Sequence, residues 1–245
     1  MAPSPRVLVW NEHRQDKTQA DVISVYPNGI NAAIADGLRE QGGLEVRCAT
    51  LDDPDQGCSE AALAETDVLF WWAHTAHHEV DDAVAERVAR HVHEGMGLVI
   101  LHSGHGSKVF RRILGTSGAL AWREDDGGER LWNLEPSHPI AEGVPPHFEL
   151  EREEMYGERF DIPTPEMLLF LGWYPYGEVF RSGCVWSRGH GRVFYFQPGH
   201  ETHPTFYHPH VRRILGNAAR WCAARVRIPI AFPNVPKMPP LPGSC

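Results

Sequence analysis

Three continuous apolar runs, each followed by polar residues and a helical pattern, constrain the fold of this chain more than any other feature. The runs are RVLVW (6–10), DVLFWW (67–72) and LVIL (98–101). An apolar run without alternation is typical of a strand buried on both faces, as in a parallel sheet covered by helices. The sequence therefore predicts a three-layer α/β fold that binds its ligand beyond the carboxyl ends of the strands.

Other segments extend this pattern. We expect helices over 28–41 and 79–94, a strand over 44–49, a short helix opened by Ser59 and a last helix after Pro209. Three later apolar stretches predict strands, and the turn sequence SRGHG makes the last two an antiparallel pair; they are MLLFLGW (167–173), EVFRSGCVW (178–186) and RVFYFQPGH (192–200).

We assign residues 1–227 to a single domain, in which 120–150 is a hairpin and loop insertion. Residues 228–245 form a proline-rich tail that cannot be helical. Its apolar residues, Ile230, Phe232 and Leu241, would be uncovered in a monomer, so we expect the tail to promote a homo-oligomer.

Composition narrows the classes of partner. The net charge is −9 and the acidic residues are spread along the chain, which favours a small-molecule partner over nucleic acid or a membrane surface. Neither a signal peptide nor a membrane-spanning run is evident, so a cytoplasmic location is expected. The five cysteines are scattered without a CxxC pair, which supports neither a disulfide framework nor a cysteine zinc site.

Histidines gather where the predicted strands end. His74 follows the strand at 67–72, His102 and His105 follow the strand at 98–101, and His200 follows the last strand. Neutral imidazole is a good ligand for a divalent cation such as zinc or manganese, and an open coordination position can polarise a carbonyl. We therefore predict that His74, His105 and His200 bind a divalent metal. The alternative is that each is a hydrogen-bonded structural histidine.

Several motifs occur together and in order; they are WWAHTAHHEV, GMGLVILHSGHGSKVFRRILGT, HPIAEG, EREEMYGERFDIP, GEVFRSGCVWSRGHGRVFYFQPGHETHPTF and NAARW. Over almost the whole chain they resemble the ThuA-like family, the trehalose utilization proteins. The resemblance implies a class I glutamine amidotransferase-like fold, built on a flavodoxin-like parallel sheet. It also implies a role in sugar catabolism, often beside sugar dehydrogenases that make 3-keto-glycosides.

The sequence departs from the amidotransferases at the turn after 98–101. There an amidotransferase has Gly-Cys-Gly, whereas this chain has His102, Ser103, Gly104 and His105. Without the cysteine, thiolate attack on glutamine is excluded. Ser103 could be a nucleophile with His200 as its base, or it could cap the helix expected near Lys108.

Further candidates lie outside the histidine runs. His102 and Glu154 are expected beside the metal as ligand or proton carrier, and Tyr156 as a donor to a developing oxyanion. The neighbouring Glu153 could equally belong to a solvated charge run. Glu12, Arg181 and Trp72 are candidate substrate-binding residues, Arg181 through its fork of donors and Trp72 by stacking on a sugar face.

These observations favour a metal-dependent enzyme that acts on a keto-sugar or disaccharide derivative by isomerisation, elimination or hydrolysis. Two alternatives stay open at this point. One is a sugar-binding or regulatory module without catalysis, and the other is a serine hydrolase that uses Ser103 and His200.

Overall fold

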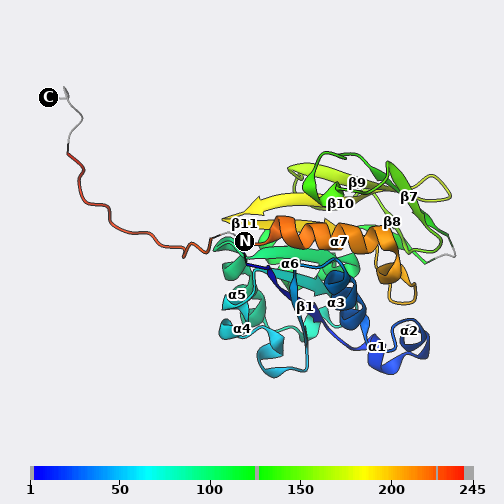
Figure 1. The fold of residues 1–245 in the computed structure, drawn as a ribbon, viewed down its shortest axis with the longest axis horizontal. Helices are drawn as coiled ribbons and strands as arrows, with labels where there is room; N and C mark the ends of the chain where they lie inside the picture. Colours follow the sequence, from blue (N-terminus) through cyan, green and yellow to red (C-terminus); the bar gives the residue numbers. More distant parts are fainter. Residues whose placement is uncertain (1–2, 125–126, 225, 240–245) are drawn as a thin grey trace.

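A single large sheet runs through the protein (Figure 1). The computed structural model describes residues 3–124, 127–224 and 226–239, and in these ranges nine strands pair in the order β2-β1-β3-β4-β11-β10-β9-β6-β7. The strands are β1 (Arg6–Asn11), β2 (Glu45–Thr50), β3 (Val68–Trp72), β4 (Gly97–Leu101), β6 (Glu129–Asn133), β7 (His147–Leu150), β9 (Met167–Trp173), β10 (Val179–Arg188) and β11 (Gly191–Phe196). A small separate sheet pairs β5 (Ala121–Arg123) with β8 (Met155–Gly157).

Helices cover both faces of the large sheet over its parallel strands. One apolar core lies under α3 and α7, and the other lies under α4, α5 and α6. The α-helices are α1 (Gln15–Thr18), α2 (Ala20–Val25), α3 (Ile30–Glu40), α4 (Glu60–Ala64), α5 (Asp82–His93), α6 (Lys108–Leu114) and α7 (Pro209–Cys222). Short 3₁₀ helices are η1 (Pro54–Gly57), η2 (His77–Glu79), η3 (His102–Gly106), η4 (Pro139–Ala141) and η5 (Thr205–Tyr207). None of the helices in the described ranges has the length and apolar character that a bilayer crossing needs.

The sheet has a parallel half and an antiparallel half. Strands β2, β1, β3, β4 and β11 are parallel, and β10, β9, β6 and β7 continue the sheet in antiparallel pairing. Three of the parallel strands, β1, β3 and β4, are the apolar runs of the sequence, and every residue in them except Arg6 is buried. The carboxyl ends of these strands therefore meet at one edge of a flavodoxin-like α/β fold, as predicted.

The segment 120–150, which we interpreted as an insertion, contributes to the main sheet. Its hairpin, β6 and β7, pairs with β9 and lengthens the antiparallel half. Its first strand, β5, instead pairs with β8 outside the main sheet. Strand β10 is antiparallel to β11, and β9 is antiparallel to β10. The end of β9, with Trp173, therefore lies at the same edge of the sheet as the carboxyl ends of the parallel strands.

A buried carboxyl group lies inside the antiparallel half. Glu129 on β6 is almost fully buried, and its Oε1 accepts a hydrogen bond of 2.7 Å from Ser182 Oγ. Position 172, beside it, is a glycine, and a Cβ there would overlap both the Glu129 carboxyl and the Ser182 hydroxyl. Burial, together with the charge of Glu153, raises the pKa of Glu129 to about 8.

This pKa predicts a specific dependence of stability on pH. The folded chain keeps the Glu129 proton up to about pH 8, whereas the unfolded chain releases it near its ordinary pKa of about 4.3. The unfolding free energy should therefore fall as pH rises between these values. Glu129→Gln should remove this slope and stabilise the protein at pH 8, by at most about 5 kcal/mol. Denaturant unfolding at pH 5 and pH 8 measures it; an unchanged slope in the variant would contradict the assignment.

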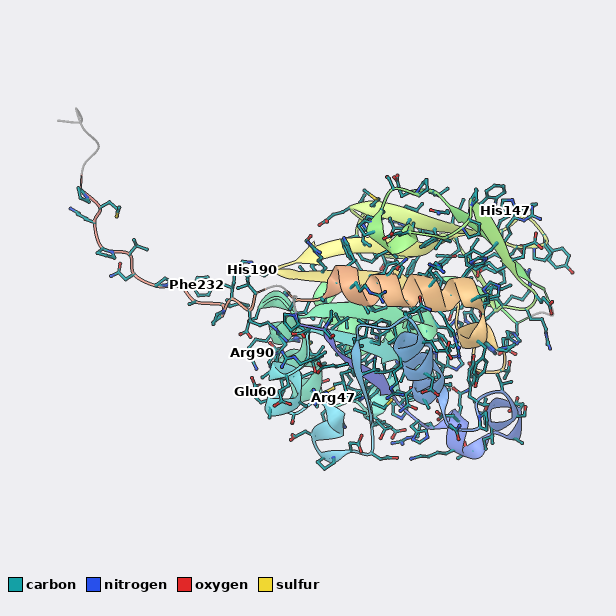
Figure 2. All side chains as sticks on the ribbon, in the orientation of Figure 1. Arg47, Glu60, Arg90, His147, His190 and Phe232 are labelled. Atoms are coloured by element: carbon teal, nitrogen blue, oxygen red, sulfur yellow. The ribbon has the colours of Figure 1, made fainter. Side chains whose placement is uncertain are left out.

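The tail leaves the body of the protein after α7 (Figure 1). Arg227 fastens its start, because the guanidinium donates to the backbone oxygens of His91 and Leu63 at 2.9 and 3.0 Å. Beyond it, Ile230 is half-exposed and Phe232 is 97% exposed, and Phe232 projects from the extended segment in Figure 2. Leu241 lies outside the described residues. Association through this tail stays a prediction.

Candidate metal centre

The chain turns sharply where β4 ends. His102 has a φ of +49°, in the left-handed region that costs a residue with a side chain on the order of 1 kcal/mol or more. Its ring is fully buried, and Nδ1 donates a hydrogen bond of 2.9 Å to the backbone oxygen of Gln197, which follows β11. Because Nδ1 holds the proton in this bond, Nε2 is the free ligand atom of the ring. The sharp turn after β4, which we call the elbow, therefore carries His102 with its Nε2 atom free to bind a ligand.

Three histidines from three strand ends meet at this elbow. His74 follows β3, His102 follows β4 and His200 follows β11. The ring centroids are 5.9 Å apart for His74 and His102, 6.1 Å for His74 and His200, and 5.5 Å for His102 and His200. The convergence of these three side chains, which the parallel topology produces, is the centre of the candidate site.

Two carboxylates complete the cluster. Glu154 Oε2 lies 3.1 Å from His102 Nε2, and Glu201 Oε2 lies 3.7 Å from His200 Nε2. In a tetrahedral zinc site with bonds of 2.0–2.1 Å, neighbouring ligand atoms lie about 3.3 Å apart. Donor atoms within 4.8 Å of one another form the sets His74, His102, Glu154 and His102, His200, Glu201. A third set adds the exposed Glu124 to Glu154 and His200.

The hydrogen-bonding state of these atoms is the strongest indication of a ligand. Among the described residues, His200 Nε2 and Glu201 Oε2 are buried and form no hydrogen bond, and the buried His102 Nε2 and Glu154 Oε2 face each other at 3.1 Å as an ion pair. Buried polar atoms in proteins are nearly always paired, so two unpaired donor atoms beside a buried histidine–glutamate pair need an explanation. Nitrogen and oxygen donors in this arrangement fit a divalent cation.

Two further residues hold the cluster in place. Gln15 donates from Nε2 to Glu201 Oε1 at 2.7 Å, and its Oε1 lies 2.9 Å from His74 Nδ1. Glu153 accepts hydrogen bonds from the backbone N–H groups of Gly199 and His200 at 3.0 and 3.1 Å, and it is fully buried rather than part of a solvated run. Gln15 and Glu201 were not among the residues predicted for the site, although Glu201 directly follows His200.

The charges within the cluster oppose one another. Burial lowers the pKa of His102, but the carboxylates of Glu154, Glu153 and Glu201 outweigh it and raise the pKa to about 9. Burial and the charge of His102 lower the pKa of His200 to about 4. Without a metal, His102 therefore carries a proton beside Glu154 while His200 stays neutral.

The hydroxyl groups beside the elbow do not form a nucleophile and base pair. Ser103 Oγ lies 3.0 Å from Tyr156 Oη, and this hydroxyl is its hydrogen-bond partner in the described residues. Ser103 also does not cap α6, because Ser107 accepts the hydrogen bond from Phe110 N. The position expected for a nucleophile belongs to His102, so the geometry gives the serine hydrolase alternative no support.

Comparison with known proteins identifies the family and the fold of the chain. The model of the ThuA (trehalose utilisation) family matches residues 6–222. The chain belongs to the ThuA family. This ThuA protein is similar in structure to a putative ThuA-like protein from Bacteroides uniformis, with a TM-score of 0.66 and 18% identity over 92% of this chain and 94% of the other. A search of curated proteins finds no match.

Two more solved structures place the fold. A putative ThuA-like protein from Parabacteroides merdae has a TM-score of 0.64 and 16% identity over 94% of this chain and 95% of the other. PurLQS from Thermotoga maritima has a TM-score of 0.51 and 13% identity over 89% and 99%. At such identities the likeness concerns the fold alone, which the ThuA protein shares with amidotransferase-like proteins.

The structure does not bring His105, one of the predicted metal ligands, into the donor cluster of this ThuA protein. His105 Nδ1 donates to the backbone oxygen of Gly118 at 2.7 Å, and its ring packs edge-on against Tyr156 and Phe160. Burial lowers the pKa of His105 to about 3. The donor sets found in the described residues do not contain His105, and His102 takes its place.

The three predicted substrate-binding residues have structural partners instead. Trp72 is 1% exposed, and its Nε1 donates to Gly199 O at 3.0 Å, so its ring is not available for stacking on a sugar. Arg181 forms a fork with Glu158 at 2.8 and 2.9 Å. The Glu12 carboxylate is fully buried and accepts hydrogen bonds from the backbone of 74–76. Glu12 therefore fixes the backbone that carries His74.

Proposed function

We propose that this protein is a divalent-metal-dependent enzyme that acts on an oxidised sugar derivative, such as a 3-keto-glycoside. The observation that carries the proposal is the convergence of buried donor atoms of His102, His200, Glu154 and Glu201 in overlapping sets, in which His200 Nε2 and Glu201 Oε2 have no hydrogen-bond partner among the described residues. Membership of the ThuA family indicates a role in carbohydrate utilisation, which supports a sugar as the substrate class.

The residues suggest how the chemistry is divided. A divalent cation held by the histidines supplies Lewis acidity toward a carbonyl or hydroxyl oxygen of the sugar. Glu154, at the edge of the cluster, is placed to accept a proton from a carbon next to such a carbonyl. Burial raises the pKa of Tyr156 well above 10, so its hydroxyl stays protonated and can donate a hydrogen bond. Isomerisation and elimination both use these roles, and hydrolysis uses them when it proceeds by elimination followed by addition of water.

The test begins with metal-stripped protein. Titration with zinc and with manganese should show about one ion per chain, and conversion of 3-keto-disaccharides should require the loaded protein. Because the pKa of His102 is about 9 and the proton must leave before Nε2 binds, metal affinity should increase from pH 6 to pH 9. Absence of stoichiometric binding, or equal conversion with and without metal, would refute the proposal; a metal-free protein that binds but does not convert sugar would be a binding module.

A further inference from the structure

Trp122 is an exposed aromatic residue in the small sheet that β5 forms with β8. It is 63% exposed, whereas tryptophan in folded proteins is mostly buried. Its backbone is fixed by the pairing of the two strands, in which Trp122 lies opposite Tyr156. A single exposed apolar residue is common on protein surfaces, so the neighbours of Trp122 on the sheet decide what it can do.

The register of the small sheet places Trp122 on the face that meets the histidine cluster. Residues directly opposite each other in an antiparallel pair share a face, so Trp122 lies on the same face as Tyr156. The Tyr156 ring stacks on the His102 ring, with centroids 5.2 Å apart. Side chains two positions apart also share a face, and Glu154 Oε2 lies 3.1 Å from His102 Nε2. The side of β5 and β8 that carries Trp122 therefore faces the cluster.

Glu124 connects this cluster to the solvent. It directly follows β5, two residues after Trp122, and its Oε1 lies 3.9 Å from His200 Nε2. The Glu124 carboxylate also belongs to one donor set with Glu154 and His200. The Glu124 side chain is nevertheless 69% exposed. It therefore extends from the buried donor atoms to the surface beside β5, which is a side from which a substrate can approach.

An exposed indole at this place suits a carbohydrate ligand. Its flat apolar surface can pack against the C–H groups of a pyranose ring, while polar neighbours bind the ring hydroxyls. The exposed Glu124 carboxylate is such a neighbour, because its oxygens accept hydrogen bonds from hydroxyl groups. Trp72, for which sugar stacking was predicted, is buried, and Trp122 is placed to take that role.

We propose that Trp122 forms the outer wall of the substrate site: a pyranose ring of the substrate stacks on its indole while the reacting carbonyl lies at the histidine cluster. The choice of a sugar as ligand rests on the proposed function, whereas the position of the wall rests on the register of β5 and β8. Trp122 is thus a binding residue, which raises the affinity for substrate and leaves the chemical step to the cluster.

The test measures binding of trehalose and of 3-keto-trehalose to metal-stripped, full-length protein by calorimetry. Trp122→Ala should weaken binding about tenfold, because the stacking contact is lost. Trp122→Phe should retain much of the affinity, whereas Trp122→Leu, which is apolar but not flat, should not. In metal-loaded protein, Trp122→Ala should raise KM for 3-keto-trehalose about tenfold and change kcat by less than about threefold.

Trp132→Ala is the matched control. Trp132 is 38% exposed on β6 of the main sheet, where its ring packs against His147 with centroids 4.9 Å apart. Its removal should leave sugar binding unchanged. Thermal unfolding and metal content should be the same in Trp122→Ala as in the native protein, which shows that the variant keeps its fold and its cluster.

The outcomes separate this inference from the proposed function. Sugar binding that is weakened in Trp122→Ala and kept in Trp132→Ala supports the wall even if the protein binds no metal and converts no sugar. Equal affinity in the native protein and Trp122→Ala, or no saturable binding of either sugar by the native protein, overturns the inference even if turnover depends on metal. Native affinity in Trp122→Leu, or a lower kcat at unchanged KM in Trp122→Ala, would overturn the stacking role.

Discussion

His200→Ala should abolish stoichiometric metal binding and lower turnover of a 3-keto-disaccharide by about 100-fold or more. The variant removes a donor atom that belongs to two of the three convergent sets, and a metal held by fewer protein ligands dissociates readily. Metal analysis after dialysis and product formation under saturating substrate measure the two effects.

Two comparisons make this result interpretable. His190→Ala should change neither quantity, because His190 is exposed on the turn between β10 and β11 (Figure 2), before the start of β11, whereas His200 follows the end of that strand. Ser103→Ala should keep its metal and most of its turnover, since Ser103 contacts Tyr156 rather than a histidine. An active His200→Ala beside an inactive, metal-loaded Ser103→Ala would refute the metal hypothesis and favour nucleophilic catalysis by serine.

Glu12→Ala should destabilise the protein by on the order of 3 kcal/mol or more and weaken metal binding at the same time. The buried Glu12 carboxylate accepts hydrogen bonds of 2.8–2.9 Å from the backbone N–H groups of His74, Thr75 and Ala76. Without it, three donors lose their partner and the loop that carries His74 is no longer fixed. Denaturant unfolding and metal titration measure the two losses.

A surface glutamate provides the reference for this variant. The Glu65 side chain is 72% exposed, and its contact with Arg47 is 4.0 Å long, so Glu65→Ala should change the unfolding free energy by less than about 0.5 kcal/mol. Glu12→Ala with a similarly small effect would show that the three backbone groups find other partners, and the positioning role would be withdrawn.

The fold was predictable because strands that are buried on both faces consist almost entirely of apolar residues. The runs at 6–10, 67–72 and 98–101 are apolar at nearly every position since helices cover both faces of β1, β3 and β4. The order of these runs and of the helices between them then sets a parallel sheet. The placement of 120–150 was less evident, because β6 and β7 are short and rich in polar residues.

The candidate site was predictable only in part. Strand ends identified His74, His102 and His200, because parallel strands bring their carboxyl ends together. The sequence did not distinguish His102 from His105, since the difference depends on a backbone φ of +49° that turns one ring toward Glu154 and leaves the other among aromatic side chains. Long-range partners such as Gln15 leave no local pattern, and its contact with Glu201 spans 186 positions.

The pairing of β4 with β11 has a consequence for synthesis of the chain. The two strands are neighbours at the centre of the sheet, although residues 102–190 lie between them. During translation, β4 is made long before β11, so the backbone N–H and C=O groups on that side of β4 stay unpaired while most of the remaining chain is made. The antiparallel half can attach to the parallel half only through β11, the same strand that delivers His200. A ribosome-bound chain that ends before residue 191 thus lacks both the central pairing and the third histidine, so the histidine cluster can assemble only after β11 has been made.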